Sequence, residues 1–307
     1  MTHTPVPPRP ILSADGRRIA CPAGEGVWLI DAAAPRRVPV PHVVELAAWG
    51  SSGLAVAGGG SVSGLDSDGR VSWTRTVRGE VPALALADGV LAIAVSGDRS
   101  SVDLLDPVTA GPIGRIDLGT AEFEGLLASG DRILVWGVEG PDDGAAAPWL
   151  GRLVSTAGVE LWAGDGAPAE PQGVLWPLSR GASARQLIGV FDVSSLTILQ
   201  HAADGWAVLD TRPWAGRGLT SSSPGGRFVA TLTADWDGNA DLYSVGVLDL
   251  HTDATVFETA VEEPGQFPAV AVDDDARLTL ASGFTGAELS VLTFTAEGSG
   301  TVRHRLA

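Results

Sequence analysis

Short apolar runs separated by turn residues repeat along the whole chain. Seven strand–turn–strand units cover residues 26–40, 62–77, 101–118, 151–164, 196–210, 246–259 and 288–306. Their turns begin at Asp31, Asp66, Asp106, Ser155, Ala202, Asp249 and Thr295, at intervals of roughly 35 to 50 residues. A short polar side chain at this place can bond the backbone two residues later, which favours a tight turn. The units are therefore predicted to be hairpins of one repeating structure.

A second hairpin precedes each of these units. Residues 83–95, ALALADGVLAIAV, show its pattern, with an apolar run on each side of an Asp-Gly turn. Together the two hairpins make four short strands in about 44 residues. No segment has convincing helical periodicity. The inner runs are apolar at every position, as expected of strands buried on both faces, whereas the outer runs alternate and carry the charges.

The repeat resembles the blades of a β-propeller. Residues 13–20, SADGRRIA, and 223–230, SPGGRFVA, resemble the first turn of a blade in bacterial WD-repeat-like propellers. The segments LDSDGRVSWT and LVSTAGVELW resemble the outer turn of quinoprotein-like repeats. The resemblance covers the whole chain and implies a seven-bladed β-propeller, all-β, with four antiparallel strands per blade. We expect a single domain with blades at about 10–40, 44–77, 81–118, 123–163, 173–210, 217–261 and 267–306.

The two ends of the chain set how this ring is expected to close. The first strand, near residues 10–13, would be the inner strand of blade 1, and the last, near residues 301–306, the outer strand of blade 7. No strand is then shared between the ends, and closure depends on packing of blade 1 against blade 7. Long loops are expected at residues 138–149 and 163–173.

Composition excludes several classes of function. The formal net charge is −17, and all 20 basic residues are Arg. A nucleic acid or an anionic membrane surface is therefore not expected as a partner, and chemistry that needs Lys is excluded. The single cysteine, Cys21, rules out an internal disulfide, and no apolar run approaches the length of a membrane helix. With no secretory signal at the N-terminus, we expect a cytoplasmic protein, and a monomer.

One face of the ring is the candidate binding surface. In a propeller, the loops that join successive blades lie on the same face as the loop between the second and third strands of each blade, and this face usually carries the ligand. Here these loops are acidic with aromatic residues among them, which suits a protein interface. The candidate partner-binding residues are Glu45, Glu80, Phe123, Glu124, Trp149, Trp214, Arg217, Trp236 and Phe267, and Glu122 lies in the same set of loops.

Residues 234–243, ADWDGNADLY, form the only stretch that suggests a metal ion. Asp235, Asp237, Asn239 and Asp241 alternate as the oxygen ligands of a calcium loop do. The glycine comes one position early, however, and residue 246, where a bidentate Glu would stand, is Gly. The alternative is a hairpin turn at Asp237 and Gly238. Calcium is thus the one cofactor to consider, and no other is expected.

These observations predict a non-catalytic interaction or scaffold module that binds a protein with a basic surface. One alternative is a propeller-type hydrolase or lactonase with carboxylates, and possible calcium, at the mouth of the channel. Another is a carbohydrate or small-ligand binder that uses Trp side chains as platforms. No nucleophile elbow or phosphate-binding loop is present in the sequence. A quinone-dependent dehydrogenase is disfavoured, because the resemblance implies Lys, calcium ligands and often a vicinal disulfide for such enzymes.

Overall fold

The computed structural model describes most of the chain. The described residues are 9–31, 34–50, 52–87, 89–129, 132–138, 149–155, 160–165, 174–177, 187–191, 195–202, 205–213, 219–235, 242–261, 265–284 and 287–306. The two predicted long loops, 138–149 and 163–173, fall largely outside these ranges. Every regular element in the described residues is a β-strand.

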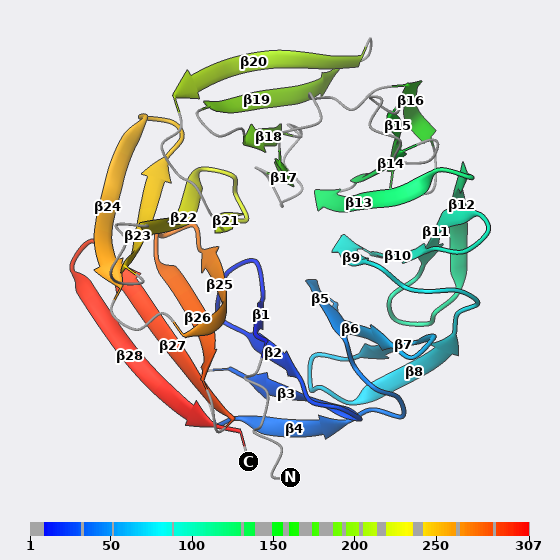
Figure 1. Ribbon diagram of the computed structural model, residues 1–307, viewed down its shortest axis with the longest axis horizontal. Helices are drawn as coiled ribbons and strands as arrows, with labels where there is room; N and C mark the ends of the chain where they lie inside the picture. Colours follow the sequence, from blue (N-terminus) through cyan, green and yellow to red (C-terminus); the bar gives the residue numbers. More distant parts are fainter. Residues whose placement is uncertain are drawn as a thin grey trace.

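The strands form seven four-stranded antiparallel sheets that stand side by side around a ring (Figure 1). We call these sheets blades 1 to 7. Within each blade the chain starts at the centre of the ring and moves outward, strand by strand, to the rim. The fold class predicted from the repeat, an all-β propeller with four antiparallel strands per sheet, is confirmed.

The blades have the following strands. Blade 1 contains β1 (Ile11–Leu12), β2 (Ile19–Pro22), β3 (Gly26–Ile30) and β4 (Arg36–Pro39). Blade 2 contains β5 (Leu46–Gly50), β6 (Gly53–Gly58), β7 (Ser61–Leu65) and β8 (Val71–Thr76). Blade 3 contains β9 (Leu84–Ala87), β10 (Val90–Val95), β11 (Ser100–Leu105) and β12 (Pro112–Gly119). Blade 4 contains β13 (Glu122–Ser129), β14 (Arg132–Val138), β15 (Trp149–Ser155) and β16 (Glu160–Asp165).

The remaining three blades follow the same order. Blade 5 contains β17 (Val174–Pro177), β18 (Leu187–Phe191), β19 (Ser195–Ala202) and β20 (Gly205–Pro213). Blade 6 contains β21 (Leu219–Ser222), β22 (Phe228–Asp235), β23 (Leu242–Asp249) and β24 (Ala254–Val261). Blade 7 contains β25 (Gln266–Val272), β26 (Leu278–Phe284), β27 (Glu288–Thr295) and β28 (Gly298–Arg305).

The hydrophobic pattern follows the position of a strand within its blade. Strands β6 and β10 are buried at every position, because both of their faces pack against a neighbouring blade. Strand β8 lies further out and alternates between half-buried and exposed positions. The core is consequently a series of apolar layers between blades, such as the cluster of Ala92 and Leu104 of blade 3 with Ile133 of blade 4.

The first turn of three blades is closed by the same device. The hydroxyl of Ser13 accepts a hydrogen bond from the backbone N–H of Arg18 at 3.0 Å, and Ser223 does the same for Phe228 at 3.2 Å. In blade 7 the Asp273 carboxylate takes this role and accepts from the N–H of Arg277 at 2.9 Å. The short polar residue recurs here because it satisfies a donor that the turn would otherwise leave unpaired.

A long side chain on the outer strand holds each of two blades to the next. The indole Nε1–H of Trp73 in β8 donates to the carbonyl of Pro107 in the outer turn of blade 3 at 2.8 Å. The guanidinium of Arg36 in β4 likewise donates to the carbonyl of Asp68 in the outer turn of blade 2. Trp73 lies flat against Gly64, where a Cβ would come within 2.4 Å of the indole. Gly64 is therefore needed for this close approach.

The ring closes by packing between blade 7 and blade 1, as the sequence predicts. Each of these sheets is a continuous run of the chain, so no strand is exchanged between the ends. Ile19 and Cys21 of blade 1 are buried against Ala281 and Leu289 of blade 7. The first strand, β1, and the last, β28, belong to the two blades that meet at this interface, or seam (Figure 1).

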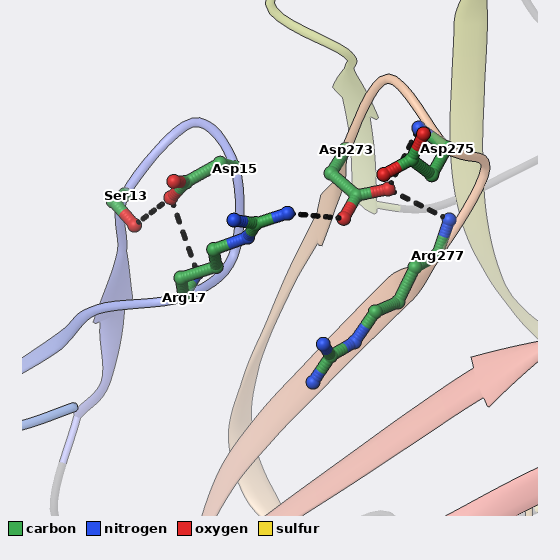
Figure 2. A network of polar contacts seen from close by, with 6 residues as sticks. All are labelled: Ser13, Asp15, Arg17, Asp273, Asp275 and Arg277. Atoms are coloured by element: carbon green, nitrogen blue, oxygen red, sulfur yellow. Dashed lines mark hydrogen bonds and ion pairs between the residues drawn. The ribbon is translucent and has the colours of Figure 1, made fainter. Parts of the chain in front are cut away.

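An ion pair joins the first turns of the same two blades. The Arg17 guanidinium lies 3.6 Å from the Asp273 carboxylate, whose side chain is only 5% exposed. Figure 2 shows the Arg17 side chain reaching from its own turn to Asp273, which also bonds the N–H groups of Asp275 and Arg277. The described residues contain no helix of the length and apolarity needed to cross a membrane.

We expect Trp73→Ala to lower the free energy of unfolding by about 2–4 kcal/mol, because it empties the space between blades 2 and 3 and removes the bond to Pro107. Trp73→Phe keeps most of the apolar contact and should cost about 1 kcal/mol. Urea denaturation of the two variants measures both values. Equal losses for Ala and Phe would show that the indole does not fill this seam.

Asp249→Asn should cost stability in a pH-dependent way. Hydrogen bonds from the Arg227 side chain, 2.7 Å from the carboxylate, lower the pKa of Asp249 from 3.8 to about 2. Because the pKa is lower in the folded state, the contribution is complete above about pH 4 and is lost as pH falls through about 2. Wild type should exceed the variant in stability at neutral pH, with a difference that narrows between these values. A difference that stays constant down to about pH 2 in urea titrations would contradict this.

Candidate binding face

The ring has two faces with different connections. The connections between blades and those between the second and third strands of a blade emerge on one side, which we call the loop face. The first and last turns of each blade emerge on the other side, which we call the turn face. This separation follows from the antiparallel order of the four strands in every sheet.

Three glutamates occupy similar places on the loop face of successive blades. Glu45 precedes β5 and its N–H bonds the carbonyl of Ala57 near the end of β6 at 2.8 Å. Glu80 forms a bridge with Ser96, just past the end of β10, and Glu122 pairs with Val138 at the end of β14. All three side chains are exposed. Among the described residues none of the three carboxylates has an ion-pair partner.

Phe267 is an exposed aromatic side chain on the loop face of blade 7. Its φ is +51°, a left-handed conformation that is costly for a bulky residue, and its side chain is 39% exposed. The guanidinium of Arg9, which precedes the first strand of blade 1, lies 4.3 Å from the centre of the ring. A cation over the face of an aromatic ring is an attractive arrangement. Phe267 and Arg9 thus give the blade 7 and blade 1 side of the face an apolar and basic character.

The other predicted partner-binding residues are placed as follows. Phe123 in β13 is half-buried and packs against the core between blades 3 and 4, so it supports the face more than it contributes surface. Glu124 lies in β13 and Trp149 starts β15, but their side chains are outside the described structure. Trp214, Arg217 and Trp236 lie outside the described residues.

The described tryptophans are structural. Trp28, Trp49, Trp73 and Trp136 are each half-buried. The Nε1–H of Trp49 donates to the carbonyl of Ile11 in the neighbouring blade at 3.1 Å, and Arg18 of that blade stacks on its ring at 4.8 Å. Their indoles therefore fill seams between strands and blades and do not form the exposed platforms that a sugar would need.

The shifted carboxyl groups cap backbone groups at loops and turns. The N–H groups of Thr109 and Gly119 lower the pKa values of Asp106 and Asp117. Burial raises the pKa of Asp15, but bonds from the Ser13 hydroxyl and a backbone N–H outweigh it and the pKa is lowered. A general acid requires the opposite shift. The lowered pKa values of these three carboxyl groups therefore indicate that they stabilise loops and turns.

The side chains of the predicted calcium ligands lie outside the described structure. Asp235 is the last residue of β22, with its side chain outside the description, and Asp237, Asn239 and Asp241 lie outside the described residues. Within the described part of the chain, no group of three or more His, Cys, Asp or Glu side chains could hold a metal ion.

The sequence did not point to Arg9. It stands apart from the repeating units, and only the ring closure brings it over Phe267. The His42 ring was also missed: it is bonded to the Val43 carbonyl and to the buried Ser63 hydroxyl, at 2.8 and 2.9 Å. Its position in the connection between blades 1 and 2 was visible in the sequence, but a single His without a partner nearby gave no reason to select it.

Comparison with known proteins identifies the fold and nothing narrower. No protein-family model matches the chain, and no curated protein matches it in sequence. Solved structures that resemble it are β-propellers, as the repeat predicted. Hydrazine synthase of Kuenenia stuttgartiensis superposes with a TM-score of 0.58 at 15% identity, over 100% of this chain and 97% of that one.

Two further propellers show a similar likeness. KlAtg21, in its complex with the coiled-coil of AgAtg16, gives a TM-score of 0.65 at 9% identity, over 97% of this chain and 99% of that one. Hsv2p of Kluyveromyces lactis gives 0.60 at 11% identity, over 97% and 98%. The set thus includes a synthase and a protein bound to a coiled coil, so the fold is compatible with either kind of function. The chain is a β-propeller at the level of the fold.

Phe267→Gly should change the free energy of unfolding by no more than about 1 kcal/mol, because relief of the left-handed backbone offsets the lost contacts. The matched change Phe294→Gly removes a side chain that is 5% exposed and should cost at least about 4 kcal/mol. Urea denaturation compares the two variants. Similar losses at both positions would show that Phe267 is a core residue and not a surface one.

Proposed function

We propose that this propeller is a non-catalytic interaction module, acting in the cytoplasm, that binds a basic segment of another protein on its loop face. The observation that carries the proposal is the row of Glu45, Glu80 and Glu122, which repeats one exposed carboxylate at three successive blades. Carboxylates that already held an arginine would have little attraction left for a partner. These three have no such internal partner in the described structure.

Phe267 lies on the loop face on the other side of the ring from the three glutamates, and it offers the partner an apolar contact. Phe267 is held outward by a strained backbone, and strain of this kind persists only where the surrounding structure enforces it. A large aromatic group on the same face as a row of charges resembles the arrangement of interface hot spots, where the aromatic group supplies affinity and the charges guide approach. KlAtg21, a propeller of similar overall fold, is itself bound to a coiled coil.

The two alternatives have weaker support. A hydrolase would need carboxyl groups that converge with raised pKa values, whereas the shifted carboxyls described here are lowered by backbone and side-chain bonds. A sugar binder would need exposed indoles, whereas the described indoles fill seams. The row of three exposed glutamates on the loop face is explained most directly by a basic protein partner.

The test of this proposal removes the negative charges of Glu45, Glu80 and Glu122. We expect the triple variant Glu45→Gln, Glu80→Gln, Glu122→Gln to bind an Arg-rich peptide at least about tenfold more weakly than wild type at low salt, because three charges that guide association are removed. Fluorescence anisotropy at increasing salt measures the affinity. The wild-type affinity should fall with salt more steeply than that of the variant.

The control makes the same change in charge elsewhere. Asp68, Glu258 and Glu297 are exposed and lie on the turn face or the outer rim. Their triple replacement by Asn, Gln and Gln should leave peptide affinity near the wild-type value. If both triple variants lost affinity equally, the peptide would be responding to net charge, and the loop face would not be the binding surface.

A further inference from the structure

An open cleft separates blade 7 from blade 1 at the ring closure. Its volume is about 470 Å³, within the range of small-ligand sites. It starts at the first turn of blade 1, at Gly16 and Arg17, and extends between β26, β27 and β28 on one side and β2 and β3 on the other. The corresponding space between blades 2 and 3 is only about 10 Å³.

A pair of small residues keeps this seam open. Where blade 2 faces blade 3, the cross-strand pair on its two outer strands is Gly64 and Trp73, and the indole fills the space. The same pair in blade 7 is Thr293 and Gly300. A Cβ on Gly300 would meet no atom within 4 Å.

Three other blades have a larger side chain in this pair. The equivalent pair is Leu29 and Arg36 in blade 1, Leu104 and Gly114 in blade 3, and Val247 and Phe257 in blade 6. Each of these pairs includes at least one long or bulky side chain that covers the next blade. The cleft at blade 7 therefore arises because Thr293 and Gly300 are small, and not from a general feature of the ring.

Two arginines and a histidine line the cleft of an otherwise acidic protein. Arg17, Arg277 and His304 line it, whereas the chain as a whole carries a formal charge of −17. Arg17 is paired with Asp273 at 3.6 Å. The side chain of Arg277 points away from that network along its strand (Figure 2), and within the described structure its guanidinium has no ion pair or hydrogen bond.

An unbonded hydroxyl faces the same space. Thr279 lines the cleft and is 3% exposed as a whole residue, and its hydroxyl makes no hydrogen bond with any described residue. The hydroxyl oxygen is not among the fully buried unbonded atoms of the described residues, so it is accessible from the cleft and free to bond a ligand atom or water. Ile19, Ile30 and Val291 supply apolar wall beside it. Asp31 is the acidic residue of the lining, and it lies at the outer turn of blade 1.

We propose that this cleft binds a small organic anion, with its carboxylate or phosphate group on Arg277 and the Thr279 hydroxyl and its hydrocarbon part against the apolar wall. A guanidinium provides charge-assisted hydrogen bonds to either acidic group. The site is separate from the loop face, because Gly16, Arg17 and Arg277 belong to first turns, which emerge on the turn face.

Calorimetric titration of the full chain with four probes tests the proposal. Octanoate and octyl phosphate combine an acidic group with a hydrocarbon chain, octan-1-ol lacks the charge, and acetate lacks the chain. At least one of the two amphipathic anions should bind about tenfold or more tightly than octan-1-ol and acetate. The preference between the two shows whether the site takes a carboxylate or a phosphate. No binding of either anion, or equal binding of octan-1-ol, would overturn the proposal.

Variants locate the site. Arg277→Gln should weaken anion binding about tenfold or more, while Arg70→Gln, which changes an arginine with an 81% exposed side chain in blade 2, should leave it unchanged. Gly300→Trp adds an indole opposite Thr293 at the outer end of the cleft and should abolish binding, and its thermal midpoint is measured to confirm that the variant is folded. Anion binding that survives both Arg277→Gln and Gly300→Trp in folded protein would show that the cleft is not the site.

Discussion

Inner strands such as β6 of blade 2 and β10 of blade 3 are buried at every position, and this constraint organises the whole structure. A single blade cannot bury both faces of such a strand, because a face without a neighbouring blade remains in water. When blades stack, every blade except the first and the last has both faces buried. Closing the stack into a ring buries the remaining two faces against each other, and here Ile19 and Cys21 contact Ala281 and Leu289.

The seams between blades carry the differences that matter for function. Trp73 and Arg36 bond the outer turn of the following blade, and the space left behind Trp73 is only about 10 Å³. At the closing seam an ion pair between Arg17 and Asp273 ties the first turns together, but Gly300 leaves the outer part open. The same architecture thus produces a sealed interface in one place and a cleft in another through a single cross-strand pair.

The two faces of the ring differ in how their polar side chains are bonded. Short turns on the turn face are capped by their own Ser and Asp side chains, and these side chains have little capacity left for a partner. On the loop face, Glu45, Glu80 and Glu122 have their backbone groups in the sheet and their carboxylates in solvent. Regular backbone pairing therefore positions charges on this face without neutralising them.

The sequence by itself determined the repeat, the strand content, the turns and the way the ends meet. These depend on neighbours along the chain: alternation of apolar residues within a strand, and a Ser or Asp that bonds an N–H up to five residues away, as Ser13 does for Arg18. The exposed positions of Glu45, Glu80 and Phe267 also followed, because the repeat indicates which connections share a face.

Only the tertiary structure decided what occupies each seam. Trp49 and Trp73 each donate the indole N–H to a carbonyl of an adjacent blade, and nothing in the sequence repeat indicates these partners. The pairing of Thr293 with Gly300, the unbonded Thr279 hydroxyl and the stacking of Arg9 on Phe267 depend on register between strands and on the meeting of chain ends. Such contacts join residues far apart in the chain, and their geometry is set by how all seven sheets share the circumference of one ring.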